Sequence, residues 1–293
     1  MTRHRESGSH SAAGRGTDGI RLVLLDVDGT LIGNHGVHPR VWPALAKARG
    51  EGIRVGLCTG RPGIGSTLEL AAEVGPDEPH ILLSGAVVGS PGRPPMLTTS
   101  LAPPLVRALR DLAAAHGVPL ELYIGEAMVV EQLDRITVLH AESLGVTPTV
   151  LASLADLTDQ PVAACFTVPR DQWASLEAAC AGLPLASVSA ATTPWAPDSI
   201  FVNVGAAGTS KGAAISWLIK HLDLTRDSVA MVGDGMNDLD AFDAVGLSIA
   251  VAGAPLEVRT AADLVVGDAD QGAVADALEH ILGRQAGNHQ SAC

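Results

Sequence analysis

Aromatic residues are scarce in this chain, at 3% of 293 positions. Proteins that hold single-stranded nucleic acid stack its bases on aromatic side chains, and nucleic-acid binders normally carry a basic face. The formal charge of −13 points the same way, so we expect no nucleic-acid partner. The simpler interpretation of that charge is solubility, and the sharper one is that some carboxylates are clustered around a metal.

Cysteine is sparse as well. The chain has four cysteines, far apart and without a C-x-x-C pair: Cys58, Cys165, Cys180 and Cys293. This spacing predicts neither a zinc site nor a disulfide framework, so we expect reduced, buried thiols. No apolar run approaches the ~20 residues of a membrane span, so we expect no membrane partner. Residues 1–19 lack the apolar core of a signal peptide, which predicts a disordered tail and a cytoplasmic protein.

Hydrophobic residues, at 47%, are abundant enough to form a substantial core. Short apolar runs predict strands near residues 21–26, 53–58, 80–83, 229–232 and 247–251, with a shorter one at 264–266. Helical spacing of apolar residues separates them, at residues 39–50, 67–74, 211–221, 239–245 and 272–282. This alternation predicts an α/β fold built on a Rossmann-like parallel sheet.

The pattern changes in the middle of the chain, where turn-rich hairpins are mixed with helices. This mixture predicts an inserted α+β domain over residues 87–204, which we call the cap. The parallel-sheet domain, here the core domain, would then comprise residues 20–86 and 205–284. The polar residues 285–293 are predicted to form a second disordered tail.

Two carboxylates two positions apart follow the first predicted strand, in Asp26-Val27-Asp28-Gly29-Thr30. Ligands of open α/β sheets bind outside the carboxyl ends of the strands. Two acids at such a place repel each other, and a divalent cation such as Mg²⁺, which prefers oxygen ligands, relieves the repulsion. A D-G dipeptide alone is equally typical of a tight turn, and the preceding buried run favours the site.

Two more polar segments reach the same edge of the predicted sheet. Thr59-Gly60-Arg61 follows the second strand, and its hydroxyl and backbone N–H groups could hold phosphate oxygens. Lys211 begins a helix, where its charge opposes the helix dipole. A lysine at this position would be explained if its charge neutralises a phosphate and a nucleophilic carboxylate. A plain turn and an incidental lysine beside an N-cap are the alternatives.

The most informative segment is Gly233-Asp234-Gly235-Met236-Asn237-Asp238, which follows the strand at 229–232. Asp234 is best placed to contact the cation, and Asp238 to orient water ligands or Lys211 from behind. Its spacing does not match a calcium loop of the EF-hand type, and a solvated acidic turn is the weaker interpretation.

These motifs, in this order, resemble the haloacid dehalogenase superfamily, and more narrowly its Cof-type, C2-capped phosphatases. The motifs are D-x-D-G-T, T-G-R, a lone S-K-G and G-D-G-M-N-D. The gap between Thr59 and Lys211 is long enough for the cap domain of that family. Single motifs are weak signals, whereas four in this order with this topology are strong.

The resemblance implies an Mg²⁺-dependent phosphatase. Asp26 would attack phosphorus and form an aspartyl-phosphate, and Asp28 would act as acid and then as base. Asp26 and Asp234 would bind the metal through side chains, and Asp28 through its carbonyl group. Thr59 and Lys211 would hold the transferring phosphoryl group together with neighbouring positions, namely Gly29, Gly60 and Asn237.

Two positions depart from the family pattern, since Ser84 and Gly253 stand where such phosphatases usually have asparagine. If that second asparagine only supplies a left-handed turn, Gly253 would do so without steric cost. Ser84 keeps a hydroxyl group but loses the reach of the amide. Both changes concern substrate contacts more than phosphoryl chemistry.

The expected substrate is a small phosphorylated metabolite, a sugar phosphate or a cofactor phosphate. The alternatives are a sugar-phosphate phosphotransferase or mutase, and a phosphometabolite-binding protein without turnover. Four cap residues are candidates for substrate recognition: Arg93, Tyr123, Arg135 and His140. The sequence does not predict the oligomeric state.

Overall fold

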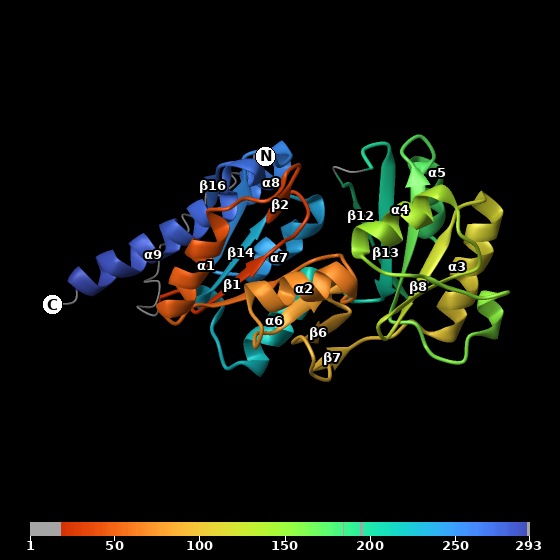
Figure 1. The fold of residues 1–293 in the computed structure, drawn as a ribbon, viewed down its shortest axis with the longest axis horizontal. Coiled ribbons are helices and arrows are strands. Elements are labelled where there is room, and N and C mark those ends of the chain that lie inside the picture. The colour runs from red at the N-terminus through yellow and green to blue at the C-terminus, as the bar shows by residue number, and fades with distance from the viewer. Residues whose placement is uncertain (1–18, 184, 194–195, 292–293) are drawn as a thin grey trace, which may run out of the picture.

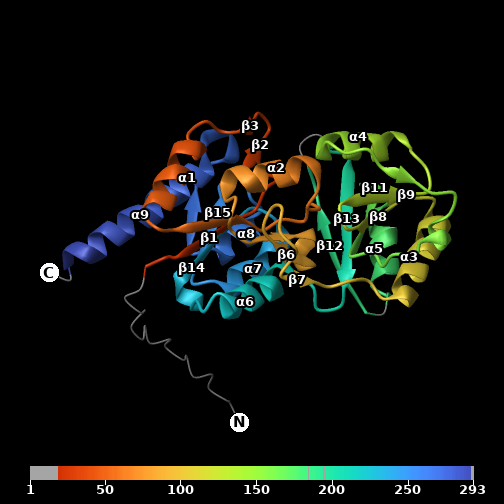
Figure 2. The same ribbon diagram turned by 60° about the horizontal axis from the view of Figure 1, so that its bottom comes forward.

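The computed structural model describes residues 19–183, 185–193 and 196–291, which form two bodies side by side (Figure 1). The first contains a parallel sheet and both ends of the described chain, and the second contains a mixed sheet. Figure 2 shows the second body, on the right, attached through the segments that follow β7 and β13. Among the described residues, no helix has the length and hydropathy of a membrane span.

The core sheet has the strand order β16-β15-β14-β1-β4, and every pairing in it is parallel. Its strands are β1 Leu22–Leu25, β4 Arg54–Leu57, β14 Val229–Gly233, β15 Leu247–Val251 and β16 Leu264–Val266. All residues of β1, β14 and β15 are buried, as expected for strands covered on both faces. The parallel α/β core predicted from the sequence is confirmed.

Helices cover both faces of this sheet. One face packs against α1 Val41–Gly50, α2 Gly65–Val74 and α9 Ala273–Ser291. The other packs against α6 Lys211–His221, α7 Leu239–Ala244 and α8 Leu256–Ala261. Alternate β1 residues serve the two faces, with Val23 in the first cluster and Leu24 in the second.

The strand predicted at 80–83 is β5 His80–Leu82, and it lies beside the core sheet as part of a separate antiparallel unit. A parallel bridge from Ile81 to Cys58 joins it to the end of β4. Its ladder partner is β6 Val87–Gly89, which pairs in turn with β7 Leu97–Thr98. Val88 packs in the cluster that contains β1 residues. We therefore propose that the division between core and cap falls after β7 and not at residue 87.

The second body has a six-stranded sheet of order β10-β9-β8-β11-β13-β12. Its elements are α3 Pro103–His116, β8 Leu120–Ile124, β9 Ala127–Val130, α4 Arg135–Leu144, β10 Thr149–Val150, β11 Ala163–Pro169, α5 Trp173–Cys180, β12 Ala186–Ala191 and β13 Ser199–Ala206. Helices α3 and α5 pack on one face. The other face packs with α4 and with core residues such as Ile64 and Leu83. One face of the cap sheet is therefore directed at the core domain.

The predicted carboxyl-terminal tail is wrong for residues 285–291, because α9 continues to Ser291. The segment contains no proline to end the helix, and the Gln285 side-chain amide donates a 2.8 Å hydrogen bond to the Ile20 carbonyl group. Residues 1–18 and 292–293 of the two predicted tails lie outside the described residues.

Short elements complete the fold. A small hairpin follows the first motif, formed by β2 Ile32–Gly33 and β3 Gly36–Val37. Single 3₁₀ turns lie at Leu83–Gly85, Leu154–Asp156, Arg226–Ser228, Met236–Asp238 and Ala269–Gln271. The hairpin and α8 were not predicted, since their apolar runs are too short to show a period.

Candidate active site

The predicted motifs meet at the carboxyl edge of the core sheet. Asp26 follows β1, Thr59 follows β4 and Asp234 follows β14. All three line one cavity of about 450 Å³ between the core sheet and the cap, together with Asp28 and Asn237. Parallel strands bring their ends to one edge of a sheet, which is why residues so distant in sequence converge here.

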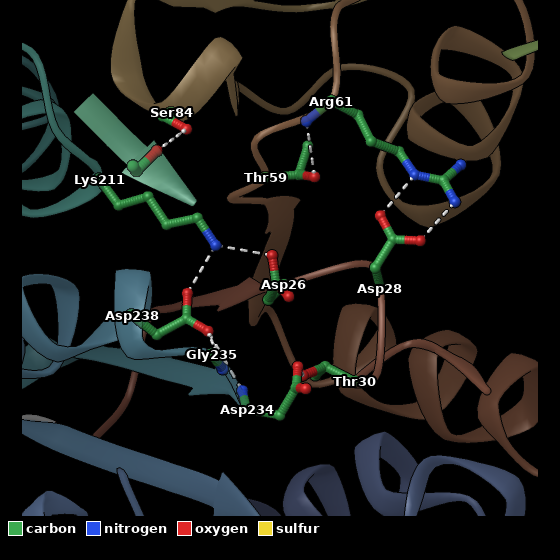
Figure 3. Close-up of polar contacts among 11 residues, drawn as sticks. Asp26, Asp28, Thr30, Thr59, Arg61, Ser84, Lys211, Asp234, Gly235 and Asp238 are labelled. Atoms are coloured by element: carbon green, nitrogen blue, oxygen red, sulfur yellow. Dashed lines mark hydrogen bonds and ion pairs between the residues drawn. The ribbon is translucent and has the colours of Figure 1, made fainter. Parts of the chain in front are cut away.

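Lys211 lies behind this edge, between two carboxylates (Figure 3). Its Nζ donates hydrogen bonds of 2.7 Å to Oδ1 of Asp26 and 2.6 Å to Oδ1 of Asp238. Lys211 is 1% exposed and Asp238 is fully buried. Burial disfavours the ammonium form, but Asp238 and Asp26 outweigh it and raise the pKa of Lys211 well above its usual value. Ser210 caps the helix by accepting a hydrogen bond from the N–H of Ala213, so Lys211 starts α6 at a fixed position.

Asp238 also organises the loop after β14. Its Oδ2 accepts hydrogen bonds from the backbone N–H groups of Asp234, at 3.1 Å, and Gly235, at 2.9 Å. A Cβ at Gly233 would lie 2.6 Å from this carboxylate, so the glycine permits the close approach. One side chain thus links Lys211 to the loop that carries Asp234.

Asp234 and Asp26 form the front of the same acidic group. Oxygen atoms of Asp26, Asp234 and Asp238 lie within 4.8 Å of one another. Burial raises the pKa of Asp234 to about 6, although Thr30 Oγ1 donates a 2.7 Å hydrogen bond to its Oδ1. Burial also raises the pKa of Asp26, against the pull of Lys211.

This donor set fits a magnesium ion. It consists of oxygen atoms alone, and nearby buried carboxylates with raised pKa values are stabilised by a divalent cation. Both oxygens of Asp238 already accept hydrogen bonds, from Lys211 and from the loop amides. Asp26 and Asp234 are therefore the side chains in the described part of the cluster best placed to serve as ligands.

Asp28 is held by Arg61, a contact that the sequence analysis did not predict. The guanidinium donates two hydrogen bonds of 2.7 Å, from Nε to Oδ2 and from Nη2 to Oδ1 of Asp28. Thr59 Oγ1 accepts a 3.1 Å hydrogen bond from the N–H of Arg61, so the turn after β4 fixes the start of this side chain. Arg61 closes the T-G-R motif, and its position in that motif was the available signal. A two-point clamp of this kind orients a carboxylate as well as neutralising it.

The predicted phosphate contacts are distributed unevenly. Gly60 and Asn237 line the cavity. Gly29 has a φ of +85°, and a Cβ there would collide with the Asp234 carboxylate. The backbone conformation and the neighbouring Asp234 therefore both require glycine at position 29. A contact between Gly29 and phosphate stays a prediction.

Ser84 and Gly253, the two positions that depart from the family pattern, differ in backbone conformation. Ser84 adopts a left-handed conformation, with a φ of 52°, and its Oγ lies 3.4 Å from the Oγ of Ser189 in the cap. Gly253 is not among the glycines with positive φ, so the suggested left-handed turn is wrong there. A Cβ at Gly253 would lie 2.9 Å from Oδ1 of Asp268, and this close approach explains the glycine.

The four cap candidates separate into two pairs. Tyr123 and His140 line the cavity, on the wall opposite the motifs. Arg93 lies in the turn between β6 and β7, where it pairs with Asp77 at the surface, and Arg135 is exposed at the start of α4. Glu121, which was not among the predicted site residues, is a fully buried carboxylate in contact with both Tyr123 and His140.

The comparison with known families agrees with this geometry. The model of the haloacid dehalogenase-like hydrolases matches residues 23–278, which include every motif described above. The chain belongs to this family. Its motifs and its cap, inserted between the second and third of them, place this haloacid dehalogenase-like hydrolase among the Cof-type phosphatases.

Three relatives illustrate the similarity. The Bacillus subtilis protein YxeH, named as a phosphatase, is 25% identical over 89% of this chain and 98% of its own. The pyridoxal phosphate phosphatase YbhA of Escherichia coli is 24% identical over 85% of this chain and 93% of its own. A solved structure of a phosphatase of the same superfamily from Bacteroides thetaiotaomicron aligns with a TM-score of 0.74 and 25% identity. That alignment covers 93% of this chain and 99% of the other.

Proposed function

We propose that this phosphatase hydrolyses the phosphate monoester of a small metabolite, with Mg²⁺, through an aspartyl-phosphate on Asp26. The proposal rests on one observation: Asp26, Asp28 and Asp234 line the same cavity, and the Lys211 ammonium group donates a hydrogen bond to Asp26. The name of the Escherichia coli relative supports a cofactor phosphate as substrate, and a sugar phosphate is the other class we expect. The cytoplasmic location remains a prediction from the sequence.

In the first step, an oxygen of Asp26 bonds to phosphorus while the bond from phosphorus to the substrate's alcohol oxygen breaks. Asp28 gives a proton to that departing oxygen. Lys211 favours the carboxylate form of Asp26, against the effect of burial, and opposes the repulsion between this carboxylate and the phosphate dianion. Thr59, Gly60 and Asn237 line the cavity where the phosphate oxygens would lie.

In the second step, Asp28 takes a proton from water, and the water oxygen bonds to phosphorus as the bond to Asp26 breaks. Inorganic phosphate leaves and Asp26 is a free carboxylate again. Magnesium, held by Asp26, Asp234 and the Asp28 carbonyl group, would supply positive charge beside the phosphoryl group. Arg61 keeps the Asp28 side chain oriented between the two steps.

The test is phosphate release from p-nitrophenyl phosphate by the wild type and by Asp26→Asn. We expect release that stops with a chelator and returns with Mg²⁺, and a loss of at least about a thousandfold in Asp26→Asn. Asp243→Asn is the matched control, because it removes the same charge at an exposed position of α7. Near wild-type release by Asp26→Asn would contradict the proposal. Transfer of phosphate to an added hexose in place of water would instead favour the phosphotransferase.

A further inference from the structure

Asn203 is a polar side chain in the middle of an apolar strand of the cap. It lies on β13 between Val202 and Val204, which are fully buried on the face of the cap sheet that α3 and α5 cover. Successive side chains of a strand point to opposite faces, so Asn203 lies on the face directed at the core domain. Asparagine is depleted in strands, and the packing of the cap alone does not explain an amide here.

The Asn203 side chain reaches the turn that follows β4. A Cβ at Gly60 would lie 3.3 Å from Nδ2 of Asn203 and 3.4 Å from Oγ of Ser84. The glycine thus leaves the space that the cap amide needs. Ser84 has a short side chain, and its Oγ lies 3.4 Å from the Oγ of Ser189, which pairs with Asn203 in the cap sheet. The cap therefore places an amide beside the T-G-R motif of the core domain.

Asn203 also lies where two cavities meet. It lines the active-site cavity and a second cavity, of about 370 Å³, between the cap sheet and the start of α6. Asp26 and Thr59 line the first cavity, Lys211 lines the second, and Asn237 lines both. Because Lys211 donates a hydrogen bond to Asp26, the junction of the cavities lies close to the proposed nucleophile. Asn203 on the cap and Asn237 on the core domain are thus two amides at this junction.

The charged side chains around the junction already have partners, whereas the Asn203 amide does not. Arg61 and Lys211 are the only arginine and lysine among the described residues that line the two cavities. Arg61 donates to one carboxylate and Lys211 to two. Asn203 is partly buried, and its side chain has no hydrogen-bond partner among the described residues. Its two N–H donors are therefore available to a ligand.

We propose that Asn203 donates a hydrogen bond to an oxygen atom of the substrate's phosphoryl group and so positions this group from the cap side. The contact lies beside Gly60, which we expect to hold phosphate oxygens from the core side. A cap residue that contacts the phosphoryl group serves every substrate alike, since that group is common to all of them. This inference rests on the proposed phosphatase function of the same cavity.

The test measures inorganic phosphate and two phosphorylated compounds with different leaving groups. The inhibition constant of inorganic phosphate is determined with Mg²⁺ present, together with kcat/KM for p-nitrophenyl phosphate and for acetyl phosphate. For Asn203→Ala we expect the inhibition constant to rise about tenfold, the effect of one hydrogen bond to a charged group. Both kcat/KM values should fall by a similar factor, so that their ratio stays at the wild-type value.

A second substitution tests the sign of the interaction. Asn203→Asp keeps the shape of the side chain but replaces the N–H donors with a carboxylate, which repels a phosphate dianion. We therefore expect a larger loss than in Asn203→Ala, again equal for both substrates. Ser187→Asp is the matched control, because it adds the same charge at a position of the cap that lines the second cavity and not the first. It should change the three constants much less.

Each outcome decides between the claims. An unchanged phosphate inhibition constant in folded Asn203→Ala would overturn the inference and leave the phosphatase function in place. A loss on one substrate and not the other would do the same, since it assigns Asn203 to the leaving group. A purely structural role would lower the melting temperature without making Asn203→Asp bind phosphate more weakly than Asn203→Ala. A wild type that releases phosphate from neither compound would overturn the proposed function itself.

Discussion

Lys211 Nζ donates a 2.7 Å hydrogen bond to Oδ1 of Asp26, although 185 positions separate the two residues. The same ammonium donates to Asp238, so one buried cation balances two carboxylates. Because Asp26 already accepts a hydrogen bond from Lys211, the floor of the cavity is preorganised before a phosphate enters it.

Lys211→Met is therefore expected to reduce both stability and activity. It leaves Asp26 and Asp238 buried without their cation, and removing one partner of a buried pair costs about 3–5 kcal/mol. Urea unfolding measures this loss, and Lys220→Met, at an exposed position near the end of the same helix, should have little effect. Adding Asp238→Asn to Lys211→Met should recover part of the stability and none of the activity. Strictly additive free energies of unfolding would argue against the shared cation.

Gly65→Ala is expected to weaken the approach of the cap to the core. Gly65 has a φ of +46°, and a Cβ there would overlap the carbonyl oxygen of Leu144 at the end of α4. Gly117→Ala is the matched control, because its φ is +64° and its Cβ would meet nothing within 4 Å. Both variants should lose about 1–2 kcal/mol of stability from backbone strain.

Steady-state kinetics distinguish the two glycine variants. We expect Gly65→Ala alone to lower kcat/KM, by about tenfold, since a displaced α4 moves one wall of the cavity away from the motifs. Equal kcat/KM values in Gly65→Ala and Gly117→Ala would show that the contact between α2 and α4 does not affect the reaction.

His80 is expected to make the fold sensitive to mild acid. Its Nδ1 accepts a hydrogen bond from the N–H of Leu57, and Nε2 lies 2.9 Å from the Gly75 carbonyl oxygen, so the neutral ring fits its site. Burial lowers the pKa of His80 from 6.5 to about 4. Between these pH values the unfolded chain binds a proton that the folded chain does not. Its stabilising contribution is therefore complete above pH 6.5 and is lost as the pH falls toward 4.

The expected loss from this one group is about 3 kcal/mol over the whole interval. Urea unfolding of the wild type and of His80→Asn across that interval measures it. The substituted protein lacks the titrating ring, so its free energy of unfolding should fall less steeply with acid. Parallel curves for the two proteins would show that His80 does not titrate as we expect.

The motif residues at strand ends were predictable because their signals are local. Asp26 and Asp234 each follow a short apolar run, and the rule for parallel sheets brings such ends together. Other features depend on contacts between distant segments. The link between Glu121 and His140 joins β8 to α4, and the clamp of Arg61 on Asp28 joins the turns after two strands. No sequence period marks either contact.

The errors in the predicted fold have the same origin. The apolar run at β5 predicts a strand correctly, but it does not show which strand will pair with it. β5 forms its ladder with β6 and only one bridge, from Ile81 to Cys58, with the end of β4. At the carboxyl terminus, the polar composition predicted a disordered tail. A helix with many polar residues can still form when one of its faces contacts the rest of the protein, as Gln285 does through its hydrogen bond to Ile20.

The most direct test of the account uses Asp28→Asn with p-nitrophenyl phosphate and Mg²⁺. p-Nitrophenolate leaves without needing a proton, so transfer to Asp26 should still occur, whereas hydrolysis needs Asp28 as a base. We predict a rapid release of about one p-nitrophenolate per protein molecule, followed by slow turnover. Mass spectrometry should then find one phosphoryl group on the peptide that contains Asp26. Release without a burst, or a phosphoryl group on another residue, would contradict Asp26 as the nucleophile.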